Sequence, residues 1–245
     1  PTDGVLSRAM KPTGDDRTRR AAAGPAAAPA ARPGAGPAEE RAPAARPRVP
    51  PLILASTSPR RAELLRMLNL SFEVVPPGVP EEFRPGETAA AHAERLAREK
   101  AAAVALQRPD ALVVGCDTVV VIDGEVLGKP RDREHAVEML LRLQGREHRV
   151  ETGIAVAAPD GRMESSLEGV HVRFRPFDRR TAVEYVATGE PLDKAGAYGI
   201  QGYGAALVES IKGDFFAVMG LPIARMVSLL RALGWRYNFR GLEPW

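Results

Sequence analysis

Apolar and polar positions follow two interleaved patterns from residue 52 onward. Short apolar runs, several of them rich in β-branched residues, predict strands, whereas longer stretches with apolar residues on one helical face predict helices. We expect strands at about 52–55, 72–75, 112–114, 119–122, 150–157, 167–175 and 205–211. We expect helices at about 59–68, 88–106, 132–143, 178–187 and 222–233. Strands and helices alternate along the chain, which favours an α/β fold.

The boundaries between these elements carry their own signals. Ser58 is a good N-cap residue, and Pro59 suits the first position of the helix that follows. Asp132 and Asp178 are cap residues for two later helices. Asp-Gly pairs at 123–124 and 160–161 are hairpin signals, so part of the sheet should be antiparallel. We therefore predict a mixed, twisted sheet flanked by helices.

The first 50 residues differ from the rest in composition. They are dominated by Ala, Pro, Gly and Arg and have no apolar periodicity. Such a segment cannot bury enough apolar surface to offset the entropy of ordering it. We predict a disordered arm over 1–50, a folded domain over 51–236 and a C-terminal tail over 237–245. An organelle transit peptide is the less favoured interpretation of the arm, because prolines would interrupt an amphipathic helix.

The net charge of +3 is unevenly distributed. Residues 1–50 hold nine basic and five acidic residues, a net charge of +4, which leaves 25 basic and 26 acidic residues in the rest. A near-neutral domain argues against nucleic acid as the partner. The sequence has no apolar run of about 18 residues that could span a membrane, and its single cysteine, Cys116, cannot form an intramolecular disulfide. We expect a cytoplasmic protein.

The most informative short segment is the turn between the first strand and the first helix, which reads ASTSPRR over residues 55–61. A helix that begins directly after a strand presents free backbone N–H groups at the positive end of its dipole, which is an anion site. Ser56 adds a hydroxyl, and Arg60 and Arg61 add guanidinium groups suited to phosphate. The alternative is a common Ser-Pro helix start with two solvated arginines.

A second segment, GCDT, lies between two expected strands. An acid at the end of a buried strand must be paired, bind a metal or have a shifted pKa, so Asp117 is a candidate general base or Mg²⁺ ligand. The alternative is a turn-forming Asp that bonds to nearby amides. Glu81, in a Pro-rich loop with Glu82, would complete a Mg²⁺ site if it lay near Asp117. Cys116 is interpreted as a small buried residue.

Three cations and one amide complete the set of candidates. Lys129 follows a glycine that would let the backbone approach a ligand, and Lys100 lies on a helix face of alanines, where it either reaches a site or is solvated. Residues 191–205 form an irregular segment rich in Gly and Ala that contains Lys194 and Gln201. A Gln side chain can form two hydrogen bonds with a nucleobase edge. A purely structural loop is the alternative for this segment.

These segments together resemble the Maf family of nucleoside triphosphate pyrophosphatases, once described as septum formation inhibitors. The matching blocks are LASTSPRRAELL, EKA, GCDTVVVIDGEVLGKP, TG, GEPLDKAGAYGIQG and GDFFAVMGLPIARM, in the order of the family. They cover about residues 52–233. The resemblance implies an α/β fold with a nucleotide cleft between two lobes.

The resemblance also implies an activity and a set of site residues. The activity is Mg²⁺- or Mn²⁺-assisted hydrolysis of a nucleoside triphosphate to the monophosphate and pyrophosphate, and the DKAGAYGIQG segment resembles the subgroup that acts on dTTP and UTP. Modified pyrimidine nucleotides are further candidates. By position, Asp117 matches the proton acceptor. Positions linked to substrate choice are matched by Arg60, Thr118 and Gln201. Positions expected to face the phosphates or the site are matched by Ser56, Arg61, Lys100, Lys129 and Lys194. Glu81 and Asp117 are the expected metal ligands.

Two departures from the family and two alternatives stay open. Family members carry an Asp–Glu pair where this chain has Pro80-Glu81, so only the Glu is kept, and either Glu82 substitutes or metal affinity falls. Phe216-Ala217 also stands where the family commonly has a polar residue. A nucleotide-binding regulator of cell division that does not hydrolyse its ligand would use the same phosphate site. A nucleic-acid-binding module would depend on the arm alone. The sequence leaves a homodimer open.

Overall fold

The computed structural model describes residues 49–245 of the chain. The predicted arm over 1–50 therefore lies outside the described residues, except for its last two positions. The described part is a mixed α/β structure built on a seven-stranded sheet, and the predicted fold class is confirmed. Every helix among the described residues is too short or too polar to span a membrane.

The sheet combines parallel and antiparallel pairs. Its main path has the order β2-β1-β3-β5-β6-β7, and β4 pairs with β3 beside it. β1 is parallel to β2 and β3, whereas all other pairs are antiparallel. The bounds are β1 (Leu52–Ala55), β2 (Glu73–Val74), β3 (Leu112–Ile122), β4 (Glu125–Leu127), β5 (Glu147–Ala157), β6 (Met163–Phe174) and β7 (Val208–Lys212).

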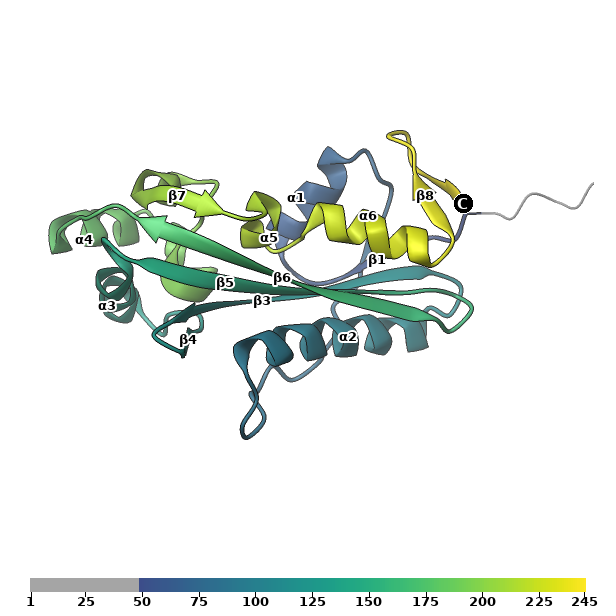
Figure 1. Cartoon of the computed structure of the whole chain (residues 1–245), viewed down its shortest axis with the longest axis horizontal. Helices are drawn as coiled ribbons and strands as arrows, with labels where there is room; N and C mark the ends of the chain where they lie inside the picture. The colour runs from purple at the N-terminus through teal and green to yellow at the C-terminus, as the bar shows by residue number, and fades with distance from the viewer. Residues whose placement is uncertain (1–48) are drawn as a thin grey trace, which may run out of the picture. The chain divides into compact units, whose positions relative to one another are not determined.

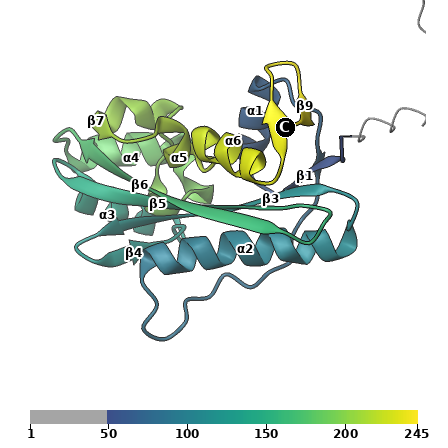
Figure 2. The ribbon, with the colours of Figure 1, turned by 45° about the vertical axis from the view of Figure 1, so that its right-hand side comes forward.

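Helices cover both faces of the sheet and one of its ends (Figure 1). The long helix α2 packs on one face, α1, α5 and α6 pack on the other, and α3 and α4 lie together at the end of the sheet near β4 and β7, as the rotated view in Figure 2 also shows. The bounds are α1 (Pro59–Met67), α2 (Ala89–Gln107), α3 (Arg133–Leu143), α4 (Arg179–Ala187), α5 (Phe215–Met219) and α6 (Ile223–Ala232).

Short elements complete the chain. Three 3₁₀ turns connect α4 to β7, and a small hairpin follows α6. Their bounds are η1 (Glu190–Asp193), η2 (Ala195–Ala197), η3 (Tyr203–Leu207), β8 (Trp235–Tyr237) and β9 (Leu242–Pro244). The segment 237–245, set apart as a tail on sequence grounds, thus contains β9, which pairs with β8.

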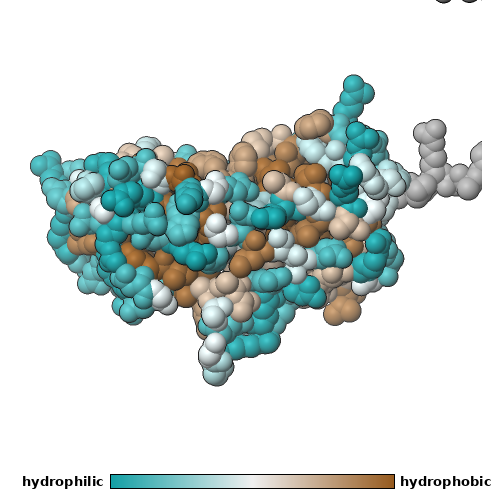
Figure 3. Space-filling model, in the orientation of Figure 1, coloured by the Kyte–Doolittle hydropathy of each residue, from teal (hydrophilic) through white to brown (hydrophobic). Residues whose placement is uncertain are grey.

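Alternate strand residues face different layers, and this divides the core. Ile53 and Val113 pack against the alanine face of α2, whereas Leu52 and Val114 pack against α1 and α6. A further cluster around Phe174 lies between α3, α4 and the far half of the sheet. We call the half of the sheet with α1, α2 and α6 the first lobe and the half with α3 and α4 the second lobe. Figure 3 shows hydrophobic side chains mainly in the middle of the drawn face, with hydrophilic ones at its left end.

β3 corrects one expectation. We predicted two strands, 112–114 and 119–122, with GCDT between them and Asp117 at a strand end. The structure has one strand, because Cys116, Asp117 and Thr118 continue the pairing with Ile154, Gly153 and Thr152 of β5. Asp117 therefore lies inside a strand, and its backbone is paired with β5 along one edge of that strand.

The other edge of β3 is interrupted next to Asp117. The pairing with β1 ends where Ala55 faces Gly115, and the pairing with β4 begins where Leu127 faces Val120. Within the described chain, residues 116–119 of β3 have no strand neighbour on this edge. The break in the sheet lies between the two lobes and leaves room for a cleft.

Candidate active site

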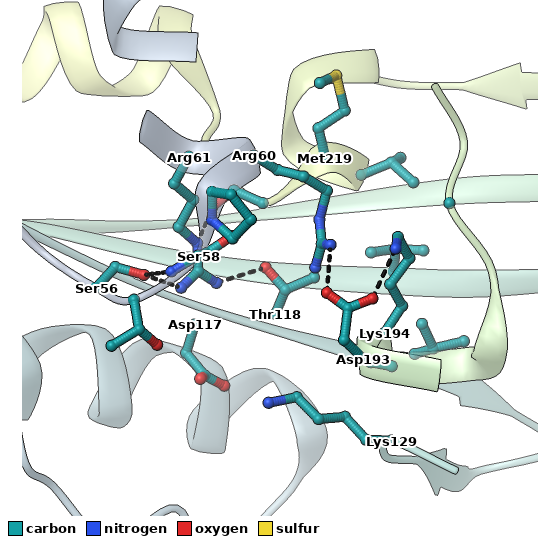
Figure 4. A pocket seen from close by; sticks show the side chains of 18 of the residues that line it. Ser56, Ser58, Arg60, Arg61, Asp117, Thr118, Lys129, Asp193, Lys194 and Met219 are labelled. Carbon is teal, nitrogen blue, oxygen red and sulfur yellow. Dashed lines mark hydrogen bonds and ion pairs between the residues drawn. The ribbon is translucent and has the colours of Figure 1, made fainter. Parts of the chain in front are cut away.

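A cleft of about 590 Å³ opens at this break in the sheet. Its walls come from both lobes and are shown from close by in Figure 4. The lining segments are the β1–α1 turn (56–61), the Pro-rich loop (76–79 and Glu81), Asp117, Thr118 and Val120 of β3, Lys129, Val150, residues 193–195 and 198–201, and the end of α5 (218–220). Segments that are far apart in sequence thus meet around Asp117.

The β1–α1 turn is organised by a buried serine. Ser56 Oγ accepts hydrogen bonds from the backbone N–H of Ser58 at 3.2 Å and from Arg61 Nη1 at 3.0 Å. Ser58 occupies the N-cap position of α1 and Pro59 the first helical position, as predicted. The Ser58 side chain forms no capping hydrogen bond, however, and the residue lines the cleft.

Arg61 ties the helix to the sheet and to α5. Its Nε donates to the carbonyl oxygen of Gly220 at 2.8 Å, and its Nη2 donates to Thr118 Oγ1 at 3.2 Å. Thr118 Oγ1 also accepts from Thr152 Oγ1 at 3.1 Å. With Ser56, these contacts use three of the five guanidinium N–H groups, so Arg61 is a fixed cation at the cleft wall that keeps donors to spare.

Asp117 forms an ion pair with a lysine of α2, the helix that packs on one face of the sheet. Lys100 Nζ on α2 donates to Asp117 Oδ1 at 2.7 Å and also to Glu81 Oε1 from the Pro-rich loop. The Lys100 side chain is 5% exposed and that of Asp117 10% exposed. α2 can approach this closely because residue 115 is a glycine: a Cβ there would collide with the backbone oxygen of Ala97.

The surroundings of the cleft shift the pKa values of Glu81 and Cys116 in opposite directions. Burial by itself raises the pKa of Glu81, but the hydrogen bond and charge of Lys100, with smaller contributions from Lys129 and Arg61, outweigh it and leave that pKa lowered. Burial raises the pKa of Cys116 to about 11, so this thiol stays protonated and is not a nucleophile, in agreement with its interpretation as a buried filler.

Lys129 and Lys194 face the cleft from the second lobe. Lys129 is exposed and points into the cleft toward Asp117 (Figure 4). The ion pair of Asp117 is formed by Lys100, and Lys129 has no ion pair within the described residues. Lys194 Nζ donates to Asp193 Oδ1 at 2.6 Å.

Asp193 is a cleft residue that our reasoning from sequence did not select. Its Oδ2 accepts from Arg60 Nη1 at 3.1 Å while its Oδ1 accepts from Lys194, so it joins the two lobes across the cleft. Burial raises the pKa of Asp193, but hydrogen bonds from Lys194 and Arg60 outweigh it and lower that pKa. The only sequence signal was its position next to Lys194, an acid adjacent to an expected anion-binding cation.

Gln201 belongs to the segment between the 3₁₀ turns η2 and η3. It is exposed and lines the cleft with Tyr198, Gly199 and Ile200. Tyr198 is buried, and its hydroxyl is 2.8 Å from His148 Nε2. Seven predicted site residues and the two expected metal ligands, Glu81 and Asp117, thus border one cleft. Lys100 does not line the cleft but contacts both ligands.

The carboxylates fit a divalent cation in chemistry and in number. Mg²⁺ is commonly held by one or two carboxylates together with substrate phosphates and water. Glu81 and Asp117 share Lys100, and in the described chain no third His, Cys, Asp or Glu joins them into a set of three. Glu82, the candidate substitute for the missing Asp, is not among the cleft-lining residues; its backbone oxygen accepts from Arg95 instead.

A break in a mixed α/β sheet, bordered by several cations and a buried aspartate, defines a site for a polyanionic ligand. Residues 51–233 match the family model described as Maf-like protein, and the chain belongs to the Maf family.

Curated relatives agree with this assignment. The dTTP/UTP pyrophosphatase of Symbiobacterium thermophilum is 52% identical over 184 residues, which cover 75% of this chain and 94% of that protein. The dTTP/UTP pyrophosphatases of Salmonella typhimurium and Aquifex aeolicus are 51% and 45% identical; the matches cover 73% and 74% of this chain and 91% and 95% of those proteins. A solved nucleoside-triphosphatase / dITP/XTP pyrophosphatase from Mycobacterium abscessus matches 50% of this chain and 72% of its own at 21% identity, with a TM-score of 0.34.

Proposed function

We propose that this protein hydrolyses dTTP and UTP to the nucleoside monophosphate and pyrophosphate. The observation that carries the proposal is the cleft itself, in which Asp117 faces the same space as Arg60, Lys129 and Lys194. A nucleoside triphosphate is a polyanion, and these cations provide the charge to hold it. We propose dTTP and UTP as the nucleotides because the relatives are named dTTP/UTP pyrophosphatases.

In this proposal cations of both lobes and the N-terminus of α1 hold and orient the phosphates. The N-terminus of α1 presents backbone N–H groups and the positive end of its dipole to the cleft. Arg61, fixed by Ser56 and Thr118, donates its remaining N–H groups, and Arg60 and Lys194 release Asp193 when phosphate oxygens replace its carboxylate. The enzyme thus exchanges an internal ion pair for one with the substrate.

Asp117 orients the attacking water in this proposal. Its Oδ1 is occupied by Lys100, which leaves Oδ2 to accept a hydrogen bond from water next to the α-phosphorus. Full proton transfer to Asp117 would weaken the ion pair with Lys100, so the geometry favours alignment of water with only partial proton transfer. A divalent cation held by Glu81 and Asp117 would neutralise charge that develops on the phosphates.

A pyrophosphate-release panel tests the proposal. The wild-type protein is assayed with dTTP, UTP, CTP, ATP, GTP and modified pyrimidine nucleotides, with Mg²⁺, with Mn²⁺ and with chelator. We expect dTTP and UTP to be the preferred substrates, with monophosphate and pyrophosphate as products and no turnover in chelator. Tight nucleotide binding without pyrophosphate release would instead identify the non-hydrolysing regulator. A cytoplasmic location and a homodimer stay predictions from the sequence.

A further inference from the structure

A single carboxylate lies behind the loop that carries Gln201. Glu190, in η1, accepts a hydrogen bond from the backbone N–H of Tyr203 on Oε2 at 2.8 Å. Its Oε1 accepts from the backbone N–H of Gly204 at 3.0 Å and from the hydroxyl of Tyr185 at 2.7 Å. One side chain therefore satisfies two backbone donors at the C-terminal end of the loop.

Tyr185 completes the attachment at the other end of the loop. Its hydroxyl oxygen accepts from the backbone N–H of Gly199 at 2.9 Å while its hydrogen is donated to Glu190. Tyr185 is buried on α4, a regular helix capped by Asp178. The two side chains thus connect both ends of the segment 199–204 to the helical layer of the second lobe. We call this pair, Tyr185 and Glu190, the loop clasp.

On its apolar side the loop is held by Tyr198 and Ile200, which are buried in the core cluster of the second lobe, whereas Gln201 is exposed. Residues 198–202 belong to no helix or strand, so their backbone depends on such contacts and on the clasp. Gly202 lies directly against the clasp, because a Cβ at that position would collide with the Glu190 carboxylate. Burial raises the pKa of Glu190, but the hydrogen bonds from Gly204, Tyr185 and Tyr203 outweigh it and lower that pKa. The carboxylate is therefore an acceptor throughout the neutral range.

We propose that Glu190, together with Tyr185, is a positioning residue for nucleotide selectivity: the loop clasp fixes where Gln201 and the adjoining backbone meet the base. This inference rests on the proposed function. It needs an ionised carboxylate rather than a side chain of the same shape. In a Glu190→Gln variant, one of the two acceptor oxygens becomes an NH₂ group that faces a backbone N–H donor.

Two variants and a matched control test the inference. Glu190→Gln removes an acceptor, Tyr185→Phe removes the hydroxyl, and Glu184→Gln is the control, because Glu184 is an exposed neighbour on α4 that pairs with Arg180. For each protein, kcat and KM are measured for UTP and GTP. Inorganic tripolyphosphate, which has the phosphates without a base, is used as a competitive inhibitor.

We expect the kcat/KM ratio of UTP to GTP to fall about tenfold in Glu190→Gln, the effect of losing one charge-assisted hydrogen bond. The loss should arise mainly in KM for UTP, since the chemistry around Asp117 is untouched. Tyr185→Phe should act in the same direction with a smaller effect. The inhibition constant of tripolyphosphate should stay unchanged, and the control should match the wild type. Amide exchange at Tyr203 and Gly204 should accelerate in Glu190→Gln.

Several outcomes overturn the inference. A wild-type UTP-to-GTP ratio in both variants removes the clasp from selectivity. An equal loss for UTP, GTP and tripolyphosphate assigns the effect to general damage and also overturns it. If Glu190→Gln does not fold, Tyr185→Phe decides. If the wild-type protein releases no pyrophosphate, the proposed function fails separately, and the dissociation constants of UTP and GTP replace kcat/KM in the same comparison.

Discussion

The cleft end around Asp117 and the cleft end around Gln201 are held by different kinds of structure. Asp117 lies inside a paired strand, and its partner Lys100 comes from a 19-residue helix packed onto that strand. Gln201 lies in an irregular loop whose ends are hydrogen-bonded to Glu190 and Tyr185 and whose Tyr198 and Ile200 are buried. We refer to these as the strand end and the loop end of the cleft.

The difference indicates that the groups acting on the reacting bond have a rigid support, whereas the base contacts are carried by a loop that can change. Groups that act on a reacting bond must be held closely, and strands and helices hold them better than loops do. A loop attached by two side chains can change its base contacts without any change in the strand end. Changes at the strand end should therefore affect turnover or stability, whereas changes at the loop end should affect the choice of base.

The largest effect is expected from Asp117→Asn. The neutral amide is a weaker acceptor for the attacking water and cannot share its proton, so kcat should fall about 10²-fold or more, the usual range for a group in this role. Nucleotide binding, measured by calorimetry in the presence of Mg²⁺, should persist. The matched control is Asp123→Asn, at an exposed residue beside β3 that pairs with Arg146. Normal turnover of Asp117→Asn would remove this residue from the chemistry.

The next effect concerns the ion pair behind the strand end. Lys100→Met leaves the buried Asp117 without its cation, and we expect the free energy of unfolding in urea to drop by about 3 kcal/mol. The double variant Lys100→Met/Asp117→Asn should recover part of that loss, because the uncompensated charge is gone.

Lys129→Met is the control for this measurement, since Lys129 is exposed at the same cleft. Its unfolding free energy should stay within about 0.5 kcal/mol of the wild type. An unchanged urea midpoint in Lys100→Met would show that the ion pair does not contribute to the stability of the folded protein.

A smaller effect is expected at the loop end. Gln201→Ala should lower the UTP-to-GTP ratio of kcat/KM by about tenfold, because neutral hydrogen bonds to the base are lost, while kcat for UTP stays close to wild type. Gln107→Ala, at the exposed end of α2, is the control. An unchanged UTP-to-GTP ratio of kcat/KM would exclude Gln201 from base selection. It would also contradict the assignment of base choice to the loop end.

The smallest expected effect is a pH dependence of protein stability, which arises from His148 beside the loop end. His148 packs against Tyr198, and its Nδ1 has no hydrogen-bond partner among the described residues. Burial lowers the pKa of His148 from 6.5 to about 4. Between these values the unfolded chain binds a proton that the folded protein excludes, so stability is lost as pH falls. From pH 7 to pH 5.5 the loss attributable to His148 should be about 1 kcal/mol.

His148→Gln isolates this contribution, because the variant should lose less stability than the wild type over the same pH interval in urea titrations. Gln107→Ala, which removes no titratable group, is the control and should follow the wild type. Parallel pH profiles for wild type and His148→Gln would contradict a neutral, buried imidazole behind Tyr198.

The sequence predicted the regular parts of the fold because their signals are local. Asp132 and Asp178 do cap α3 and α4, with side chains that accept from His135 and Thr181. The break in the sheet could not be predicted, because it depends on which residues of β1 and β4 face β3. The continuity of β3 through Asp117 was missed for the same reason, since pairing with β5 overrides the local turn signal of GCDT.

The site was predicted unevenly. The cations of the ASTSPRR segment and Asp117 were selected because residue type and position already indicate their chemistry. The pairing of Lys100 with Asp117 depends on the packing of α2, and the roles of Asp193 and Glu190 depend on contacts across the cleft or along an irregular loop. Hydrogen bonds between residues distant in sequence leave no periodic pattern to detect.

The break beside β3 also constrains how the protein can move. β3, β5 and β6 run without interruption through both lobes, with continuous pairing from residue 113 to residue 121 on the β5 side. A rotation of one lobe against the other would have to bend or tear these strands, so no hinge is available there. Capture of a ligand must depend on side-chain exchange and on the loops at the rim, and a bound nucleotide should leave the backbone of the sheet where it is.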